Sequence, residues 1–282
     1  MLAGLIHPIS GAAEGCRSVA RVFALVALAA ALLPMASARA AECGDDVAGR
    51  RVPCACGDIV VSDTALSATD PVVSERCSRD GLFVATPAGQ HGIRLDLSGL
   101  SLVGQGIGAG IRVVRGGSEG VTIIGGTDAT RAQIAGFETG IAASGSTAVR
   151  EIRNVDVVAN HKDGLKVRSS GLRASDVSAL RNGRSGLRVT GHGARLKDVQ
   201  AADNAGTGIR LHGSGATVDG VVTGNAGSGA RLTGRGHDLS ASEVIGNGGA
   251  GVEASGRGHA ISGATIGDNA GGDVRGSAEA VK

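Results

Sequence analysis

The sequence predicts an all-β solenoid in which coils of about 22 residues stack on one another. The first observation is an asparagine that recurs at separations of 22, 22, 21, 22 and 22 residues: Asn160, Asn182, Asn204, Asn225, Asn247 and Asn269. The second is a phrase, Gly-apolar-x-apolar, that begins four residues after each of the first five asparagines and is degraded to Gly272-Asp273-Val274 in the last copy. A unit of this length cannot bury its apolar side alone, so successive units must stack.

Three apolar columns precede each asparagine and predict about three short strands per coil. They lie eight, five and three residues before it: Ile152, Ala174, Leu196, Leu239 and Ile261; Val155, Val177, Val199 and Ala264; Val157, Ala179, Ala201, Val244 and Ile266. In the 21-residue coil that ends at Asn225, a one-residue deletion lets Val218, Val221 and Thr223 fill them. The alternation within neighbouring columns has period two, which is typical of strands separated by glycine-rich corners.

The asparagine column predicts a structural ladder at one corner of the coil. Asparagine tolerates the left-handed backbone of a sharp corner, and stacked amides can hydrogen-bond from coil to coil. On these residues the chain resembles the right-handed parallel β-helix superfamily of pectate lyases and parallel β-helix repeat proteins, whose Asn ladder occupies the tight second turn. The resemblance covers residues 150–274, extends back to about Ile93, and implies a single-stranded right-handed parallel β-helix of roughly eight or nine coils.

Before the ladder the repeat is irregular. Six apolar segments predict strands, at residues 59–61, 82–84, 93–97, 100–103, 111–113 and 121–124. The glycine phrase recurs at Gly110 and Gly140, which are 30 residues apart, and the longer step predicts an inserted loop at residues 125–131. An insertion of this kind is a better place for a specialised site than the uniform coils.

Residues 1–40 predict a signal peptide. Arg17 and Arg21 precede an apolar run at residues 22–35, and small residues stand before a cleavage site near Ala40/Ala41. The run is shorter than the roughly 20 residues of a membrane-spanning helix. We therefore expect a secreted or periplasmic protein with no stable membrane insertion.

Cleavage leaves 28 − 3 = 25 basic and 26 − 1 = 25 acidic residues, so the net charge of the mature chain gives no reason to expect nucleic acid as a partner.

Four cysteines remain after cleavage, and an even number in an exported protein predicts disulfides. Cys56 and Cys77 are 21 residues apart, which is one coil and places them roughly 5 Å from each other. This favours Cys56–Cys77 and leaves Cys43–Cys54. A metal site is the alternative, although the paired Cys-x-x-Cys of structural zinc is missing.

These features divide the chain into four predicted regions. The signal peptide is followed by a disulfide-bonded N-terminal cap and first coil at residues 41–80. The β-helix then covers residues 81–274, with its regular Asn-ladder coils at 150–274, and a polar C-terminal tail covers 275–282. The cap is expected to protect the open end of the solenoid.

A row of basic residues is the candidate ligand site. The outward position within the glycine phrase holds Lys166, Arg188, Arg210 and Arg231 in consecutive coils, with Arg112 before them and Glu253 after them. One interpretation is a set of solvated cations, partly neutralised by carboxylates such as Asp163 or Asp203. The other is a groove for an anionic polymer such as an acidic polysaccharide, because arginine binds carboxylates in a bidentate manner.

The histidines give no metal site in this interpretation. His192, His212, His237 and His259 fall in successive coils but not in one column, and a stacked metal ladder would need one column. We therefore expect surface turn residues, and neither a metal nor another cofactor is predicted.

The resemblance also implies an alternative function, that of a polysaccharide lyase or glycoside hydrolase relative. Such enzymes use clustered aspartates, often with calcium, or paired carboxylates in a cleft built by long loops. Asp176 and Asp198 stack as a pair here, but Arg173, Arg195 and Lys197 flank them, and surface ion pairing explains them more simply. The residues of an active site would otherwise lie near residues 125–131.

No catalytic residue is assigned. The mature chain contains no Trp and no Tyr, whereas sugar-binding clefts depend on aromatic platforms. An accessory role in metal-cofactor maturation, also known for this fold, would need a metal site that the sequence does not supply. The favoured function is an exported non-catalytic scaffold or binding protein, whose partner is an acidic polysaccharide or another extracytoplasmic protein.

Overall fold

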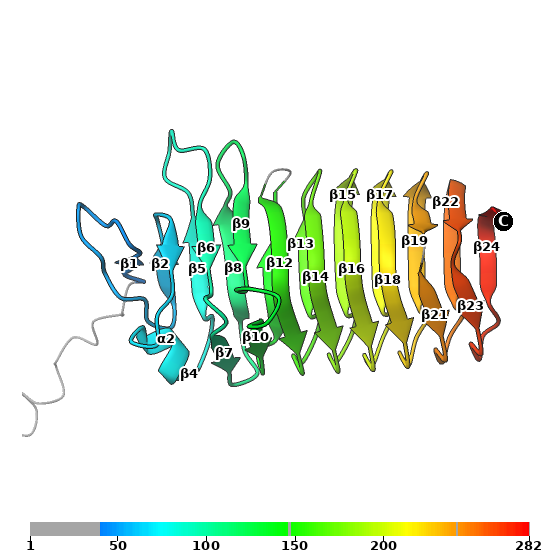
Figure 1. Cartoon of the computed structure of the whole chain (residues 1–282), viewed down its shortest axis with the longest axis horizontal. Helices are drawn as coiled ribbons and strands as arrows, with labels where there is room; N and C mark the ends of the chain where they lie inside the picture. Colours follow the sequence, from blue (N-terminus) through cyan, green and yellow to red (C-terminus); the bar gives the residue numbers. More distant parts are fainter. Residues whose placement is uncertain (1–39, 146–147, 241, 282) are drawn as a thin grey trace, which may run out of the picture. The chain divides into compact units, whose positions relative to one another are not determined.

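The computed structural model describes residues 40–145, 148–240 and 242–281. The predicted signal peptide therefore lies outside the described residues, apart from Ala40. The chain from Ala40 onward forms one compact unit, in which the coils stack one after another from β1 to β24 (Figure 1).

Three parallel sheets run along the stack, and a regular coil contributes one strand to each. Sheet 1 contains β1 (Glu42–Cys43), β2 (Asp58–Val60), β5 (Leu82–Ala85), β8 (Ala109–Arg115), β11 (Thr139–Ala143), β13 (Leu165–Arg168), β15 (Leu187–His192), β17 (Ile209–Ser214), β19 (Ala230–Arg235) and the first parts of β22 (Val252–Ser262) and β24 (Val274–Val281).

The other two sheets share several strands that bend at a corner. Sheet 2 contains β3 (Thr64–Ala65), β6 (Arg94–Asp96), β9 (Val121–Ile124), the first parts of β12 (Val149–Val158), β14 (Arg173–Leu180), β16 (Arg195–Ala202) and β18 (Thr217–Thr223), then β20 (Asp238–Ser240) and the second parts of β22 and β24. Sheet 3 contains β4 (Arg76–Cys77), β7 (Ser101–Gly104), β10 (Ala132–Ala135), the second parts of β12, β14, β16 and β18, then β21 (Glu243–Ile245) and β23 (Thr265–Gly267). A short helix, α2 (Pro71–Ser74), lies between β3 and β4.

This architecture confirms the predicted parallel β-solenoid with a repeat of about 22 residues, and it corrects one detail. The stack has about ten turns, because β1 and β2 continue sheet 1 into the cap, so the prediction of eight or nine coils is too low. Residues 275–281 of the predicted polar tail belong to β24, which pairs with β22.

The core is one apolar cluster enclosed by the three sheets. The predicted columns supply it, as Ile152, Val155 and Val157 are all fully buried. The coil that ends at Asn225 differs from the prediction, because Val222 is buried whereas Val221 is 37% exposed. The register shifts between Val218 and Gly220, so the deletion lies at that corner and the inward assignment of Val221 and Thr223 is wrong.

The six asparagines form a buried ladder at the corner between sheets 3 and 1. In one rung, the Asn182 Nδ2 donates to Asn204 Oδ1 at 2.9 Å and to the Val157 carbonyl at 3.1 Å. Asn204 Oδ1 also accepts the backbone N–H of Asn182 at 2.9 Å. The amides therefore satisfy one another and the neighbouring backbone, which buried polar groups require.

The left-handed backbone at this corner does not fall on the asparagines. It falls on the residue before each of them, for example Arg181 with φ 54° and Asp203 with φ 56°. The prediction that asparagine is chosen for a left-handed conformation is therefore wrong, and amide pairing is the physical reason for the column.

Two disulfides and a buried carboxylate hold the N-terminal cap. Cys43–Cys54 and Cys56–Cys77 have Cα separations of 5.1 and 5.4 Å. The Asp70 side chain, 1% exposed, accepts hydrogen bonds from the Cys54 N–H at 2.9 Å and from the Arg51 guanidinium at 2.7 Å.

Disulfides are typical of oxidising compartments. Within the described ranges, no helix has the length and apolar character needed to cross a membrane.

Candidate anion-binding face

The predicted basic row lies on the outer face of sheet 1. Side chains alternate between core and solvent along each strand, so Arg188 points outward between the buried Leu187 and Val189. The register pairs Lys166 with Arg188, Arg188 with Arg210, and Arg210 with Arg231. Since adjacent strands lie about 4.7–4.9 Å apart, the structure brings all four side chains together. We call this line of positions the first outward row.

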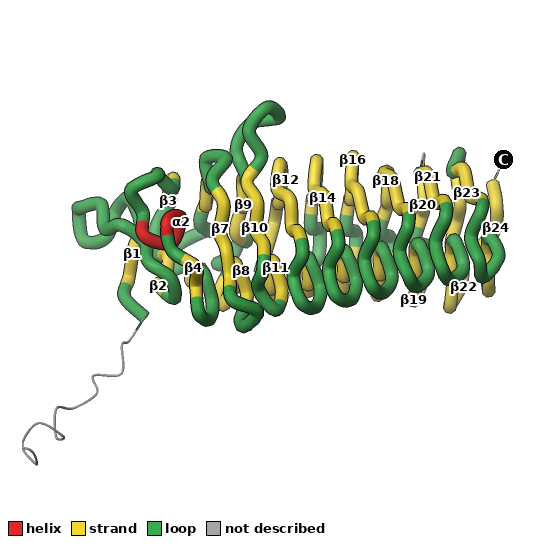
Figure 2. The backbone as a smooth tube through the Cα atoms, turned by 90° about the horizontal axis from the view of Figure 1, so that it is seen from below, coloured by secondary structure: helices red, strands yellow, loops and turns green. Residues whose placement is uncertain are grey.

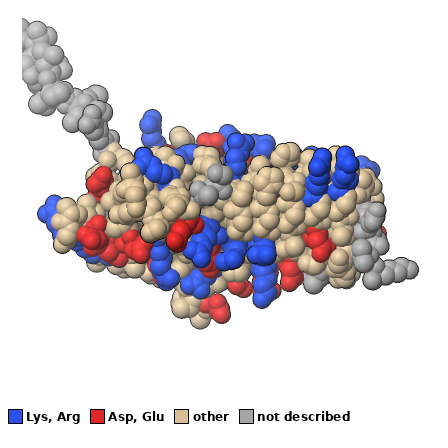
Figure 3. Space-filling model, turned by 90° about the horizontal axis from the view of Figure 1, so that it is seen from above, with Lys and Arg blue, Asp and Glu red and all other residues tan. Residues whose placement is uncertain are grey.

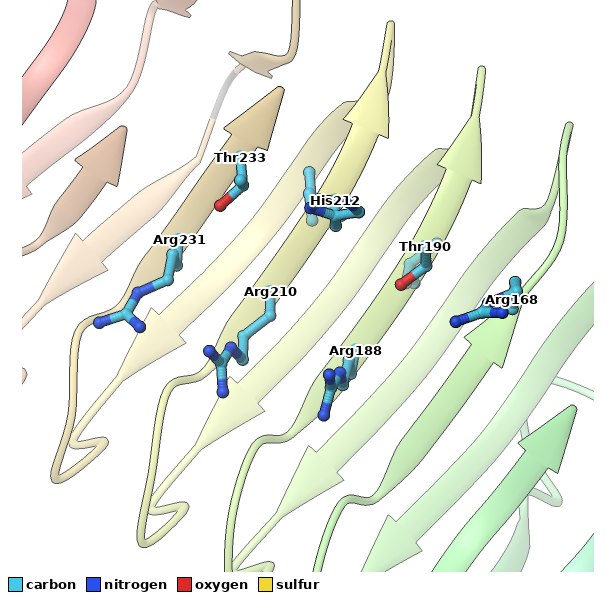
Figure 4. A pocket seen from close by; sticks show the side chains of 9 residues that line it. Arg168, Arg188, Thr190, Arg210, His212, Arg231 and Thr233 are labelled. Carbon is cyan, nitrogen blue, oxygen red and sulfur yellow. The ribbon is translucent and has the colours of Figure 1, made fainter. Parts of the chain in front are cut away.

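A second outward row runs two residues further along the same strands. It contains Arg168, Thr190, His212 and Thr233, which are also register partners. Apart from Lys166, the residues of the two rows line a hollow of about 310 Å³, in which the arginines lie side by side on successive strands (Figure 4). Arg168, Thr190 and Thr233 were not predicted as site residues, although the strand alternation, extended by one step past the glycine phrase, reaches all of them.

The ends of the first outward row are neutralised, whereas its centre is not. Arg112 contacts Asp80 at 2.7 Å, and Arg231 contacts Glu253 at 2.6 Å. In the part of the chain that the structure describes, no ion pair or side-chain hydrogen bond involves Lys166, Arg188 or Arg210. Burial lowers the pKa of Arg210, and the charges of Arg231 and Arg188 lower it further. The middle of the row therefore carries like-charge repulsion that no ion pair within the described residues relieves.

The carboxylates expected to neutralise the row do not contact it. Asp163 is 2% exposed, and its Oδ1 accepts the backbone N–H of Ser185 at 3.2 Å. Its charge favours the protonated form of Arg210 only through space. Asp203 occupies the left-handed corner position and forms no ion pair with the described residues.

Two of the four histidines lie in the core rather than in surface turns. His237 and His259 are each 1% exposed, and their rings stack at a centroid distance of 5.2 Å. His237 Nδ1 accepts the backbone N–H of Ala216 at 3.2 Å, and its Nε2 donates to the carbonyl of Thr233 at 3.1 Å. The prediction of surface turn residues is wrong for this pair, because both occupy an inward corner column.

These contacts leave His237 as a structural group. Burial lowers its pKa, so the neutral ring is favoured. Both ring nitrogens of His237 are engaged with the backbone and are not available to a ligand. Among the described residues, no group of three His, Cys, Asp or Glu side chains could hold a metal ion.

The aspartates of the alternative function lie at another corner. Asp176 and Asp198 have left-handed backbones, with φ 54° and 51°, between sheets 2 and 3. Lys197 Nζ is 3.5 Å from an Asp198 oxygen. Aspartate tolerates this conformation, so the corner explains the stacked pair without a catalytic role.

The inserted loop at residues 125–131 projects from the stack between β9 and β10 (Figure 2). Arg131 anchors it by donating two hydrogen bonds to Asp156, at 2.9 and 2.7 Å. A hollow of about 500 Å³ lies beside the loop, and Arg94, Asp96, Asp128 and Arg153 are among its lining residues. Neither Asp176 nor Asp198 lines this hollow, so the structure does not join them into one site.

The charged surface is patchy along the molecule. In the view of Figure 3, Lys and Arg side chains form separate clusters along the whole length, and acidic side chains gather mainly toward the N-terminal end. Net charge alone does not single out the first outward row, whose central cations form no ion pair with the described residues.

Comparison with known proteins identifies the fold family. Residues 104–243 match the family model described as the right handed beta helix region. The chain folds as a right-handed parallel β-helix. Among solved structures, this β-helix is similar to the A-modules of two mannuronan C-5 epimerases from Azotobacter vinelandii. With the AlgE4 module the identity is 19% and the TM-score 0.46, over 76% of this chain and 69% of that one. With the AlgE6 module the values are 18% and 0.43, over 76% and 68%. No curated protein matches the sequence of this β-helix.

Proposed function

We propose that this β-helix is an extracytoplasmic, non-catalytic binding protein that holds an acidic polysaccharide against sheet 1. The observation that carries the proposal is the stack of Lys166, Arg188 and Arg210, three register-paired cations that have no counter-ion among the described residues. Like charges side by side on a sheet are destabilising. A bound carboxylate or sulfate would relieve the repulsion and form charge-assisted hydrogen bonds.

The geometry favours a polymer over a small anion. The three cations span two strand spacings, which is about 9–10 Å along the stack. A chain with an acidic group on successive sugars can contact more than one coil at once, and each contact raises the effective concentration of the next. The second outward row adds the hydroxyls of Thr190 and Thr233 and the imidazole of His212, which suit the neutral hydroxyls of a sugar.

The carboxylates beside this face support binding rather than glycoside hydrolysis. Hydrolysis uses two carboxyl groups placed on either side of the scissile bond. Glu253 is engaged by Arg231 at 2.6 Å and by Ser228 at 3.1 Å, and Asp163 is buried against the backbone of Ser185. Neither carboxylate is free to face a ligand on the first outward row.

A second candidate function is a polysaccharide lyase or glycoside hydrolase whose site adjoins the inserted loop. The observation that favours it is the hollow of about 500 Å³ beside residues 125–131, which brings Asp96 and Asp128 to the same depression. Asp96 accepts hydrogen bonds there from the Ser98 N–H and from Arg94. This function predicts turnover of a polysaccharide, which Asp128→Ala would abolish.

The experiment that tests both functions measures retention of the exported chain on immobilised acidic and neutral polysaccharides across a salt gradient, with turnover followed in the same samples. The binding function predicts retention on acidic polymers alone and elution at raised salt, because salt screens exposed charges. Equal retention on neutral polymers, or none on either, would contradict it. Turnover would move the function to the inserted loop.

A further inference from the structure

We infer that the face contains an apolar subsite next to the free cations, which takes an acetyl group, or a similarly small acyl substituent, of the bound acidic polysaccharide. The inference rests on the proposed function and adds the chemical class of the ligand. It starts from one coil whose outward side chains are shorter than those of its neighbours.

That coil contains β11. The register of sheet 1 places Ala142 between Arg112 and Lys166 in the first outward row. Ser144 follows two residues later, in line with the second outward row. Small side chains between long ones leave a hollow of about 270 Å³, which is lined by Arg112, Val113, Val114, Ala142, Ala143, Ser144 and Lys166.

The walls of this hollow combine apolar surface with one free cation. Val114 is 58% exposed, although large apolar residues in this β-helix are mostly buried. Arg112 is held at Asp80 Oδ1 by its Nε at 2.8 Å and by a terminal nitrogen at 2.7 Å, so its charge is compensated. Lys166 on the opposite wall has no ion pair with the described residues.

An acyl group satisfies these walls. Its methyl group would cover Val114 and Ala142, and its carbonyl oxygen would accept a hydrogen bond from the Lys166 ammonium. The hollow directly adjoins the free cations, so a sugar that carries the substituent can be linked to one whose carboxylate binds Arg188. An unsubstituted hydroxyl would leave the apolar wall in water.

The test compares one acidic polysaccharide in its acetylated form and after chemical deacetylation, with dissociation constants measured by calorimetry. We expect the exported chain to bind the acetylated form about fourfold more tightly, which corresponds to the burial of one methyl group. Ala142→Leu fills the hollow without changing the charge. It should bring the ratio to about one.

The matched control is Ser175→Leu, which enlarges an outward residue of sheet 2 and should keep the ratio. Ser144→Leu fills the same hollow from the second outward row, and it replaces Ala142→Leu if that variant loses its circular dichroism signal. Equal affinity of the unaltered chain for both polymers would overturn the subsite and leave the proposed function standing. A preference that survives both filling variants would also overturn it. Binding of neither polymer would remove the proposed function itself.

Discussion

Arg188 and Arg210 are register partners on adjacent strands of sheet 1, and neither guanidinium meets a carboxylate of the described residues. Two arginines in this position raise the free energy of the unliganded face. In the proposed function an external anion completes this arrangement, so binding and stability should respond in opposite directions when the charges are removed.

The double variant Arg188→Gln/Arg210→Gln should lose affinity for an acidic polysaccharide without losing stability. Each exposed ion pair removed should weaken binding by about twofold to fivefold. The midpoint of thermal unfolding should stay unchanged or rise, since a repulsion disappears. Elution salt on the immobilised polymer and the unfolding midpoint measure the two effects.

The control for this variant is Arg173→Gln/Arg195→Gln. These arginines are also register partners on adjacent coils, but they lie on sheet 2, and the charge change is the same. The control should elute at the salt concentration of the unaltered chain. An equal loss in both double variants would show that net charge, and not sheet 1, determines retention.

Glu253 should act as a competitor for the ligand. It engages Arg231 through two hydrogen bonds, at 2.9 and 2.6 Å, and so occupies the guanidinium that would extend the free row. Glu253→Gln removes the negative charge and should raise the salt concentration needed for elution, whereas Arg231→Gln should lower it less than Arg188→Gln does. Weaker retention of Glu253→Gln would contradict this role.

An interior rung of the ladder should contribute more to stability than a terminal one. Asn204 accepts the backbone N–H of Asn182 and donates to the Ala179 carbonyl and to Asn225 Oδ1, all in the core. Asn204→Ala leaves these groups without partners and should lower the free energy of unfolding by about 2–4 kcal/mol.

The matched variant is Asn269→Ala, at the last rung, where the side chain is 8% exposed and water can replace lost contacts. Urea denaturation of the two variants compares the positions. Equal losses would mean that the ladder does not distribute its energy in this way.

Stability should decrease below about pH 6.5, the ordinary pKa of histidine. Burial lowers the pKa of His237, so the unfolded chain takes up a proton at a higher pH than the folded one. The contribution of His237 to the free energy of unfolding is therefore constant above about pH 6.5. It falls as the pH drops from there toward the pKa of His237 in the folded state.

The variant His237→Leu isolates this effect. It should be less stable at pH 8, because the Ala216 N–H loses its acceptor, yet it should lose less stability between pH 7 and pH 5. His192→Leu, which removes an exposed histidine, is the matched variant for comparison. An unchanged slope in His237→Leu would rule out His237 as the source.

The regular coils could be predicted from the sequence because their period is visible in single residues. The Asn182 to Asn204 step fixes the coil length, and the alternation of Leu187, Arg188 and Val189 decides which side chain faces out. What could not be predicted depends on local register. Val221 and Val222 are adjacent and chemically equivalent. The apolar pattern alone therefore cannot say whether the one-residue deletion comes before or after them, and so cannot say which valine is buried.

The unpredicted part of the candidate site has a similar cause. Ala142 becomes a neighbour of both Arg112 and Lys166 only after coils of 30 and 24 residues are aligned. His237 is polar and still buried, because backbone groups of Ala216 and Thr233 satisfy its ring. Neither the neighbours of Ala142 nor the burial of His237 can be predicted from residue type and spacing alone, because both depend on how the strands pair.

The Cys56–Cys77 disulfide should stabilise the cap without affecting the binding face. The two cysteines are 21 residues apart in the sequence, but the coil at this place is longer, because Asp58 pairs with Leu82. The cysteines are therefore close in space without being register partners. Closing a loop of this length contributes about 2–4 kcal/mol to stability.

In a solenoid each coil contacts mainly its neighbours, so the loss of stability in Cys56→Ala/Cys77→Ala should stay near the N-terminal end. Hydrogen exchange should increase in β2, β4 and β5 and remain unchanged in β15, β17 and β19, with retention on the acidic polymer preserved. Faster exchange along the whole stack would show that the ten turns unfold as one cooperative unit.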